Sequence, residues 1–145
     1  MHLIQFEIEH FDLIELDEGG FVSRGNRELL SAYQKIGPAI TLLNDAYEVV
    51  ACAGVIIAWG GMGEFWMVPG KLVPRYAKSV WKEAKLFIAD SIGRYNLHRI
   101  QATVRERDAR AIRWIERLGF EKEGLMRCFG ADRDNHFMYA RLINV

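Results

Sequence analysis

The 145 residues, 50% of them hydrophobic and 26% charged, are enough for one globular domain that buries its own core. The 19 basic and 19 acidic side chains cancel. No apolar run reaches the ~18 residues of a membrane span, so disordered, fibrous and membrane-spanning classes are excluded. The start, Met1–Glu7, lacks the basic and apolar regions of a signal peptide, and the two cysteines, Cys52 and Cys128, lie in apolar segments. We therefore expect one cytoplasmic domain over residues 1–145, with both thiols reduced and buried.

The zero net charge hides an asymmetry between the two halves of the chain. Residues 1–70 carry 3 basic and 10 acidic residues, whereas residues 71–145 carry 16 basic and 9 acidic residues, which gives −7 and +7. Such a split favours either a phosphate-bearing ligand at the second half or simple attraction between the halves. The balanced total argues against general nucleic-acid binding, which would show itself as a steep dependence of affinity on salt.

The first elements are predicted from the spacing of apolar residues. Ile4, Phe6 and Ile8 alternate with polar residues, which predicts a half-buried first strand. A short helix is expected over Asn26–Gln34, and Gly37 with the proline after it ends that helix.

The next elements resemble a meander of strands. Ala39–Leu43 and Glu48–Ile57 flank a turn that begins at Asn44, which is typical of an antiparallel hairpin. A glycine cluster then breaks the chain, and Glu64–Val68 forms a fourth strand that ends at Pro69.

The second half alternates between helices and strands. Apolar residues at helical spacing predict a long helix over Pro74–Ile92, with Gly93 just past its end. The further elements expected are a strand at Arg99–Val104, a helix capped by Asp108 and ended by Gly119, and strands at Leu125–Phe129 and Phe137–Ile143. This order indicates an α+β or α/β domain in which helices pack on a mixed sheet.

One segment carries a family resemblance. Asp108–Phe120 resembles the late motif Asn-x-x-Ala-x-x-x-(Tyr or aliphatic)-Glu-(Lys or Arg)-Leu-Gly-Phe of the GNAT superfamily of acyl-CoA-dependent N-acyltransferases. Glu121–Arg127 is similar to the tail that follows this motif in ribosomal-protein N-terminal acetyltransferases. The resemblance implies a mostly antiparallel mixed sheet with helices on both faces. It also implies acetyl-CoA as co-substrate, no metal, and a primary amine as acceptor, from a protein N-terminus, a lysine or a small molecule.

The loop before the long helix departs from the family. Its members hold the pyrophosphate of acyl-CoA in a loop of type (Arg or Gln)-x-x-Gly-x-(Gly or Ala), whose backbone N–H groups cradle the phosphates. Here the segment Val68–Arg75 has one glycine, Gly70, and two prolines. This chain also resembles small phage-encoded GNAT-like proteins, several of which lack the glycine loop as well. Without the glycine loop, phosphate is expected on the charged side chains of Lys71, Arg75 and Lys78 near the helix start; the alternative is that these are solvated residues on an exposed helix turn.

The resemblance also implies roles in the chemistry. The family polarises the thioester carbonyl with a backbone N–H of the fourth strand, which here lies near Trp66, Met67 or Val68. Glu64, which opens that strand, is the expected general base.

Four further positions can be compared with the family's site. Asp108 stands where many members carry an asparagine toward the cofactor, and Ile115 replaces a tyrosine that protonates the departing thiolate. His136 and Tyr139 are secondary candidates for proton transfer. The histidines lie at positions that form no zinc-ligand pair.

The sequence carries no clear signal for the identity of the acceptor. The family places it in regions that correspond to Phe21–Lys35 and Gly130–His136. Acidic residues near the first region either attract a cationic acceptor or form a solvated loop; they are Asp12, Glu15, Asp17 and Glu18. Two functions remain open from the sequence: an N-acetyltransferase that works through a ternary complex, and a catalytically inactive GNAT-fold binding or virion-associated protein. A homodimer also remains open.

Overall fold

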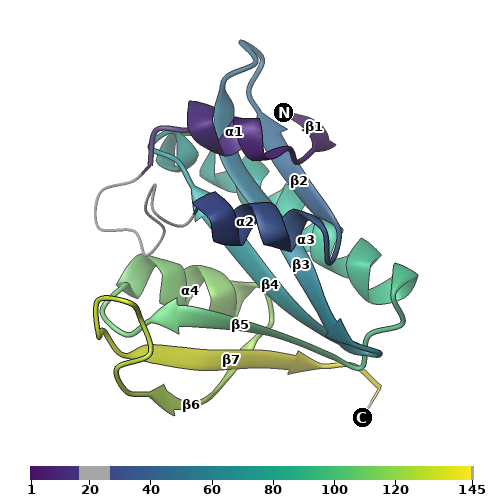
Figure 1. Cartoon of the computed structure of the whole chain (residues 1–145), viewed down its shortest axis with the longest axis vertical. Coiled ribbons are helices and arrows are strands. Elements are labelled where there is room, and N and C mark those ends of the chain that lie inside the picture. The colour runs from purple at the N-terminus through teal and green to yellow at the C-terminus, as the bar shows by residue number, and fades with distance from the viewer. Residues whose placement is uncertain (17–26, 145) are drawn as a thin grey trace.

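One seven-stranded sheet, in the order β1-β2-β3-β4-β5-β7-β6, organises the chain. The structure is a computed structural model that describes residues 1–16 and 27–144 (Figure 1). The strands are β1 (His2–Gln5), β2 (Ala39–Leu43), β3 (Val49–Trp59), β4 (Met62–Pro69), β5 (Arg99–Arg105), β6 (Glu121–Met126) and β7 (His136–Leu142). The helices are α1 (Ile8–Leu13), α2 (Arg27–Gln34), a 3-10 turn (Val73–Tyr76), α3 (Ala77–Arg94) and α4 (Ala109–Arg117).

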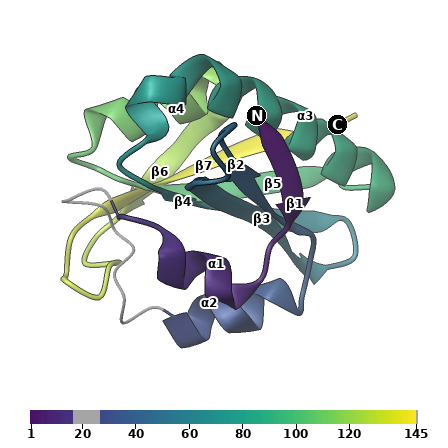
Figure 2. The same ribbon diagram turned by 90° about the horizontal axis from the view of Figure 1, so that it is seen from above.

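Helices cover both faces of this sheet. α1 and α2 lie on one face, and α3 and α4 lie on the other (Figure 2). Neighbouring strands run antiparallel except for β4 and β5, which are parallel. The expected mixed, mostly antiparallel sheet with helices on both faces is therefore confirmed. No helix in the described part of the chain is both long enough and apolar enough to cross a bilayer.

Each face of the sheet has its own core. Under α3 and α4, the fully or almost fully buried side chains include Ile88, Ile100, Ile115 and Tyr139. The other face, under α1 and α2, buries a second cluster, which consists of Phe6, Phe11, Ile14, Leu30, Cys52 and Val68. Each large side chain that is fully buried stabilises the fold by about 1.5–3 kcal/mol. The two clusters clamp β3 and β4 from both sides and so fix the position of the strand that carries Glu64.

The predicted first strand is present, but it is shorter and more exposed than expected. β1 ends at Gln5, and all four of its residues are exposed because β1 is an edge strand that pairs only with β2. The N–H of Phe6 still donates to the carbonyl of Ala39, after which α1 begins at Ile8. Glu7 and His10 form a reciprocal capping box at its start. The capping box begins a helix at Ile8, where the alternation of apolar and polar residues had predicted a continuing strand.

The predicted strand Leu125–Phe129 was also misplaced. β6 begins at Glu121, directly after the core residue Phe120, and ends at Met126. Its side chains are almost all exposed because it is the opposite edge strand, so no alternation of buried residues marks it in the sequence. The helix α3 likewise continues through Gly93 to Arg94 instead of ending before it.

The two cysteines occupy opposite environments, so the expectation that both are buried was wrong for one of them. Cys52 on β3 is fully buried, and its sulfur lies 3.7 Å from the hydroxyl of Thr41. Cys128 is exposed, with a backbone φ of 55° that places it in a turn after β6. Burial raises the pKa of the Cys52 thiol to about 11.

Alkylation by iodoacetamide at about pH 8 is therefore expected to modify Cys128 rapidly and Cys52 only when the protein unfolds, because the thiolate is the nucleophile. Mass spectrometry of the native protein should show one added group, and two after denaturation. In the control variant Cys128→Ser, the native protein should stay unmodified. Rapid double labelling of the native protein would contradict the burial of Cys52.

Candidate active site

β4 and β5 begin side by side and then diverge. Their parallel pairing covers three matched positions, from Met62 with Arg99 to Glu64 with Gln101. Beyond that point β4 continues to Pro69 against β3, and β5 continues to Arg105 against β7 (Figure 1). The separation leaves one edge of β4 without a strand partner beyond Glu64, and we call this region the splay.

The backbone alternation of β4 determines which groups point into the splay. In an antiparallel ladder, successive residues direct their N–H and C=O groups alternately toward and away from the neighbouring strand. The N–H of Gly70 donates to the carbonyl of Val50 on β3 at 3.0 Å. The N–H groups of Val68 and Trp66 therefore also point toward β3, whereas that of Met67 points away from β3, into the splay.

Met67 is the single position of β4 that offers such a donor. The N–H of Phe65 also points away from β3, but it lies directly after the last matched pair of β4 and β5, Glu64 with Gln101, where the two strands are still adjacent. Pro69 is the next residue with the same orientation as Met67, and proline has no N–H. Of the three positions expected to polarise a carbonyl, Met67 is thus the one whose N–H faces the splay.

Glu64 lies at the closed end of the splay, on the face covered by α2. Its side chain is half-buried, and its Oε1 accepts a hydrogen bond from Nε2 of Gln101 at 3.0 Å. No described residue donates to the second oxygen, Oε2. A carboxylate with one oxygen fixed and the other open can accept a proton from a group that enters the splay.

An aromatic wall stands beside this carboxylate. Trp66, two residues along the same face of β4, contacts Tyr33 of α2 and Phe6, with ring centroids 5.8 and 5.6 Å apart. A Cβ on Gly54 of β3 would come within 2.6 Å of the Trp66 ring, so the glycine makes room for the indole. Burial, followed by the negative charge of Glu64, raises the pKa of Tyr33. The negative charge of Glu64 therefore acts on the hydroxyl of Tyr33, which belongs to this aromatic wall.

The other face of the splay is closed by α4. Trp114 of α4 stacks on Phe65 of β4, with ring centroids 6.3 Å apart and planes 27° apart. Trp114 also packs against the buried cluster that contains Val80 of α3. This tryptophan therefore joins α3 and α4 across the splay.

Most backbone N–H groups of the loop after β4 donate hydrogen bonds to carbonyls of the protein itself. The N–H of Lys71 donates to the carbonyl of Glu15 at 2.8 Å, and Leu16 forms a β-bridge with Gly70. The N–H groups of Val73 and Arg75 donate to carbonyls of the same loop at 3.1 Å. Between Gly70 and Arg75, the N–H of Leu72 alone has no backbone acceptor among the described residues. One free donor does not make a phosphate cradle.

Gly70 has a packing role in this loop. A Cβ there would lie 2.8 Å from the carbonyl oxygen of Val50 and 2.9 Å from Cγ1 of Ile14. The absence of a side chain therefore lets the segment after α1 close onto the end of β4.

The basic residues expected to hold phosphate all lie at the start of the α3 region. Lys71, Arg75 and Lys78 are exposed, and none of them forms an ion pair with a described residue. The guanidinium of Arg75 lies over the ring of Tyr76, 5.7 Å from its centroid. The side chains, unlike the loop backbone, remain available to an anion.

The remaining predicted residues have structural partners. Asp108 caps α4, because its carboxylate accepts the N–H of Ala111 at 3.0 Å, and Ile115 is buried in the core. Tyr139 lies on the face opposite Glu64, where its hydroxyl donates to Glu116 at 3.1 Å, and burial raises its pKa to about 12.

His136 is buried at the start of β7. Burial, followed by the positive charge of Arg105, lowers its pKa, so the ring is held neutral.

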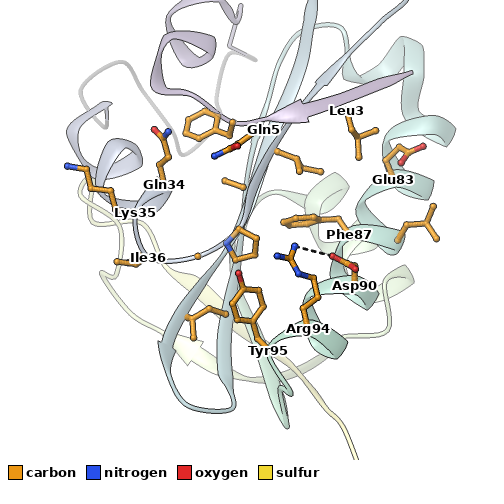
Figure 3. Close-up of a pocket in the computed structure, with 17 residues that line it drawn as sticks. Leu3, Gln5, Gln34, Lys35, Ile36, Glu83, Phe87, Asp90, Arg94 and Tyr95 are labelled. Atoms are coloured by element: carbon orange, nitrogen blue, oxygen red, sulfur yellow. Dashed lines mark ion pairs between the residues drawn. The ribbon is translucent and has the colours of Figure 1, made fainter.

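A separate cavity of about 840 Å³ lies at the β1 edge of the sheet, away from the splay. Figure 3 shows Gln34 and Lys35 on one side of it, and on the other Arg94, which pairs with Asp90 at 3.6 Å. None of the described lining residues belongs to β4 or β5. This cavity is therefore not the place where the predicted catalytic residues meet.

Two expectations concern residues outside the described part of the chain. Asp17 and Glu18 lie outside it, as does the beginning of the predicted acceptor region Phe21–Lys35. Of the remaining acidic residues, Asp12 pairs with Arg27 at 2.8 Å.

Within residues 1–16 and 27–144, no group of three histidine, cysteine or carboxylate side chains is arranged to hold a metal ion.

The structure adds polar residues that the sequence analysis did not single out. Gln101 and Arg99 lie on the face of β5 opposite its buried residues, and Glu123 of β6 pairs with Arg99. The alternation of polar and apolar residues in β5 was a visible signal, but the sequence did not reveal which strand lies beside β5.

Neither a protein-family model nor a curated protein sequence matches the chain. Among solved structures, the ribosomal-protein-S18-alanine N-acetyltransferase of Escherichia coli matches with a TM-score of 0.75 at 14% identity, covering 99% of this chain and 94% of that one. A variant of the spermidine N-acetyltransferase of Vibrio cholerae matches with a TM-score of 0.70 at 14% identity, covering 98% and 95%.

A GNAT-family acetyltransferase of Bacillus anthracis matches with a TM-score of 0.67 at 18% identity, covering 97% of this chain and 93% of that one. At identities this low, the likeness establishes the architecture and not the substrate. This chain has the GNAT fold of N-acetyltransferases.

Proposed function

We propose that this protein is an N-acetyltransferase that moves the acetyl group of acetyl-CoA to a primary amine within a ternary complex. The observation that carries the proposal is the splay, where the Met67 N–H is the only β4 donor beyond the ladder and the Glu64 carboxylate lies at the closed end. A carbonyl oxygen at Met67 would be polarised by that N–H. The GNAT fold supports this arrangement of donor strand and helices.

The proposed step is a direct transfer. The amine nitrogen attacks the carbonyl carbon of the thioester, an N–C bond forms, and the C–S bond breaks with release of the CoA thiolate. The acceptor first loses one proton to solvent to become a neutral amine, and Oε2 of Glu64 then accepts the second proton, which leaves the nitrogen as the N–C bond forms, directly or through one water molecule. The thiolate takes up a proton from solvent, because Ile115 replaces a tyrosine acid and Tyr139 is buried and bonded to Glu116.

The surroundings of Glu64 support an amine as the acceptor. An approaching primary amine is an ammonium ion at neutral pH, and aromatic faces together with a carboxylate attract such a cation. Tyr33 and Trp66 provide the aromatic faces beside Glu64. The named neighbours act on a ribosomal-protein alanine and on spermidine, so an N-terminal alanine peptide and spermidine are suitable first acceptors.

The phosphate end of acetyl-CoA must be held differently from the glycine-loop pattern. In the proposal, Lys71, Arg75 and Lys78 bind the phosphates through their side chains, since the loop backbone is engaged within the protein. Calorimetric titration with acetyl-CoA tests this part, and affinity that weakens strongly with added salt is expected. Absence of binding at millimolar acetyl-CoA would favour the alternative, a catalytically inactive GNAT-fold binding or virion-associated protein.

Replacement of the proposed base, Glu64→Gln, is expected to lower kcat about 10²–10³-fold, because general base catalysis contributes about that factor. The amide retains the shape of the side chain, so acetyl-CoA affinity should stay unchanged. The rate of radiolabelled acetyl transfer to spermidine and to the peptide measures kcat, and calorimetry measures affinity.

Glu83→Gln on α3 is the matched control, because it makes the same change at a half-buried carboxylate that contributes nothing to the splay. Its kcat should equal that of the unaltered protein. Equal activity of Glu64→Gln and the unaltered protein would remove Glu64 from the reaction.

A further inference from the structure

We infer that Gln101, oriented by Arg99 and Glu123, is a positioning residue that holds the carboxylate of Glu64 for proton transfer; this inference rests on the proposed role of Glu64. The four side chains form one continuous series of hydrogen bonds over β4, β5 and β6. Nε2 of Gln101 donates to Oε1 of Glu64 at 3.0 Å, and Nε of Arg99 donates to Oε1 of Gln101 at 3.0 Å. Nη1 and Nη2 of Arg99 donate to the two oxygens of Glu123 at 2.9 and 2.7 Å.

The series determines which way the Gln101 amide points. A guanidinium has donors and no acceptor, so the atom of Gln101 that faces Arg99 must be the oxygen. The nitrogen of the same amide then faces Glu64 and donates to it. If the amide were turned over, it would present its oxygen to a carboxylate and its N–H group to a guanidinium, and both contacts would be repulsive. Arg99 therefore decides that Gln101 acts as a donor toward Glu64.

Arg99 is in turn anchored at its far end. The bidentate pair with Glu123 is the strongest geometry available to a guanidinium and a carboxylate. The hydrogen bond from Arg99 holds the pKa of Glu123 below its ordinary value, so the anchor stays ionised near neutral pH. With both Nη atoms directed to Glu123, the Nε of Arg99 is the donor that remains for Gln101.

The arrangement has a consequence for the reactivity of Glu64. A neutral amide touches the carboxylate, while the positive charge of Arg99 is one residue further away and is paired with Glu123. Glu64 is thus held in one orientation without a direct ion pair that would neutralise its charge. The contact lies at the last matched position of the β4–β5 ladder, so it fixes the carboxylate where the splay begins.

Kinetics of Gln101→Leu test the inference, because leucine has a similar size and cannot donate. We expect kcat to fall about tenfold to hundredfold, as for a misplaced catalytic group, with KM for acetyl-CoA changed less than about twofold. In the Glu64→Gln background, Gln101→Leu should lower kcat no further, because Gln101 acts through Glu64. An equal loss of kcat in both backgrounds would overturn the inference, as would an unchanged kcat in Gln101→Leu.

Arg99→Met tests the orienting role, and Arg94→Met is its matched control. Arg94 also pairs with a carboxylate, Asp90, but it lies on α3, which covers the other face of the sheet (Figure 2). Arg99→Met should lower kcat in the same direction as Gln101→Leu, with KM for acetyl-CoA again retained, whereas Arg94→Met should leave kcat unchanged. A loss in Arg94→Met as large as that in Arg99→Met would overturn the orienting role.

A spectroscopic measurement separates this inference from the proposed function, because it needs no turnover. The side-chain amide of Gln101 should give a shifted, slowly exchanging ¹⁵N–¹H pair, assigned by its disappearance in Gln101→Leu. Arg99→Met should move this pair toward the position of a free glutamine, and Arg94→Met should not. If the unaltered protein transfers no acetyl group, the proposed function fails, and this signal still decides whether Arg99 orients Gln101. A Gln101 signal that Arg99→Met leaves unchanged would overturn the inference.

Discussion

Met67→Pro is expected to lower kcat about 10²–10³-fold, because it removes the single β4 N–H that points into the splay. Proline is tolerated in a strand where the N–H has no ladder partner, and the preceding residue, Trp66, is already extended. The substitution therefore deletes one donor without removing a sheet hydrogen bond. Steady-state kinetics with spermidine or the peptide, under saturating acetyl-CoA, measure the loss.

Met67→Ala is the control for this substitution. Alanine retains the N–H but removes most of a half-buried side chain, which is expected to cost about 1–2 kcal/mol of stability. Its kcat should remain near that of the unaltered protein, and circular dichroism should show both variants folded. If Met67→Ala lost as much kcat as Met67→Pro, the side chain and not the N–H would be the important group.

Gly37→Ala is expected to lower the free energy of unfolding by about 3 kcal/mol, the upper part of the range for overpacking. A Cβ at this position would lie 1.8 Å from the carbonyl oxygen of Val55, which is backbone and cannot rotate away. The chain on both sides of Gly37 is bonded to β3, since Val55 and Ile57 donate to the carbonyls of Pro38 and Ile36 at 2.9 Å. Relief of the clash therefore requires these two bonds to lengthen. Urea unfolding followed by tryptophan fluorescence measures the loss.

Gly93→Ala is the comparison for Gly37→Ala. Gly93 lies inside α3, and a Cβ there would meet nothing within 4 Å. Alanine should therefore raise the free energy of unfolding by about 0.5–1 kcal/mol, because glycine is a poor helix former. Similar destabilisation by both substitutions would mean that the close approach of Gly37 to β3 is not what decides the effect.

The sequence predicted most elements because their local signals agree with their surroundings. The hairpin of β2 and β3, the stripe of α3 and the Asp108 cap of α4 all follow from periodicity, turn residues and capping chemistry. The predictions failed at both sheet edges. β1 and β6 bury none of their residues fully, so burial leaves no alternating pattern there, and α1 depends on a capping pair inside an apparent strand.

In the candidate site, too, features of neighbouring residues were predicted, whereas contacts between distant segments were not. The fourth strand was expected from the sequence, and the family resemblance pointed to Glu64 because this residue opens that strand. Gln101 was not, because its partner lies 37 residues away, and the pairing of β4 with β5 is made across α3. The choice of Met67 among three neighbouring residues depended on the registers of β4 with β3 and with β5.

By itself, the sequence predicted most of the order of elements, showed that Val68–Arg75 carries one glycine and two prolines, and placed an acidic residue in the fourth strand, since each of these depends on neighbouring residues. Only the tertiary structure decided that β4 and β5 separate after Glu64, that Met67 directs its N–H into the splay, and that Gln101 holds Glu64. The physical reason is that strand register sets the direction of every backbone N–H and the neighbour of every side chain. Register is a relation between segments far apart in the chain, and no short stretch of sequence contains it.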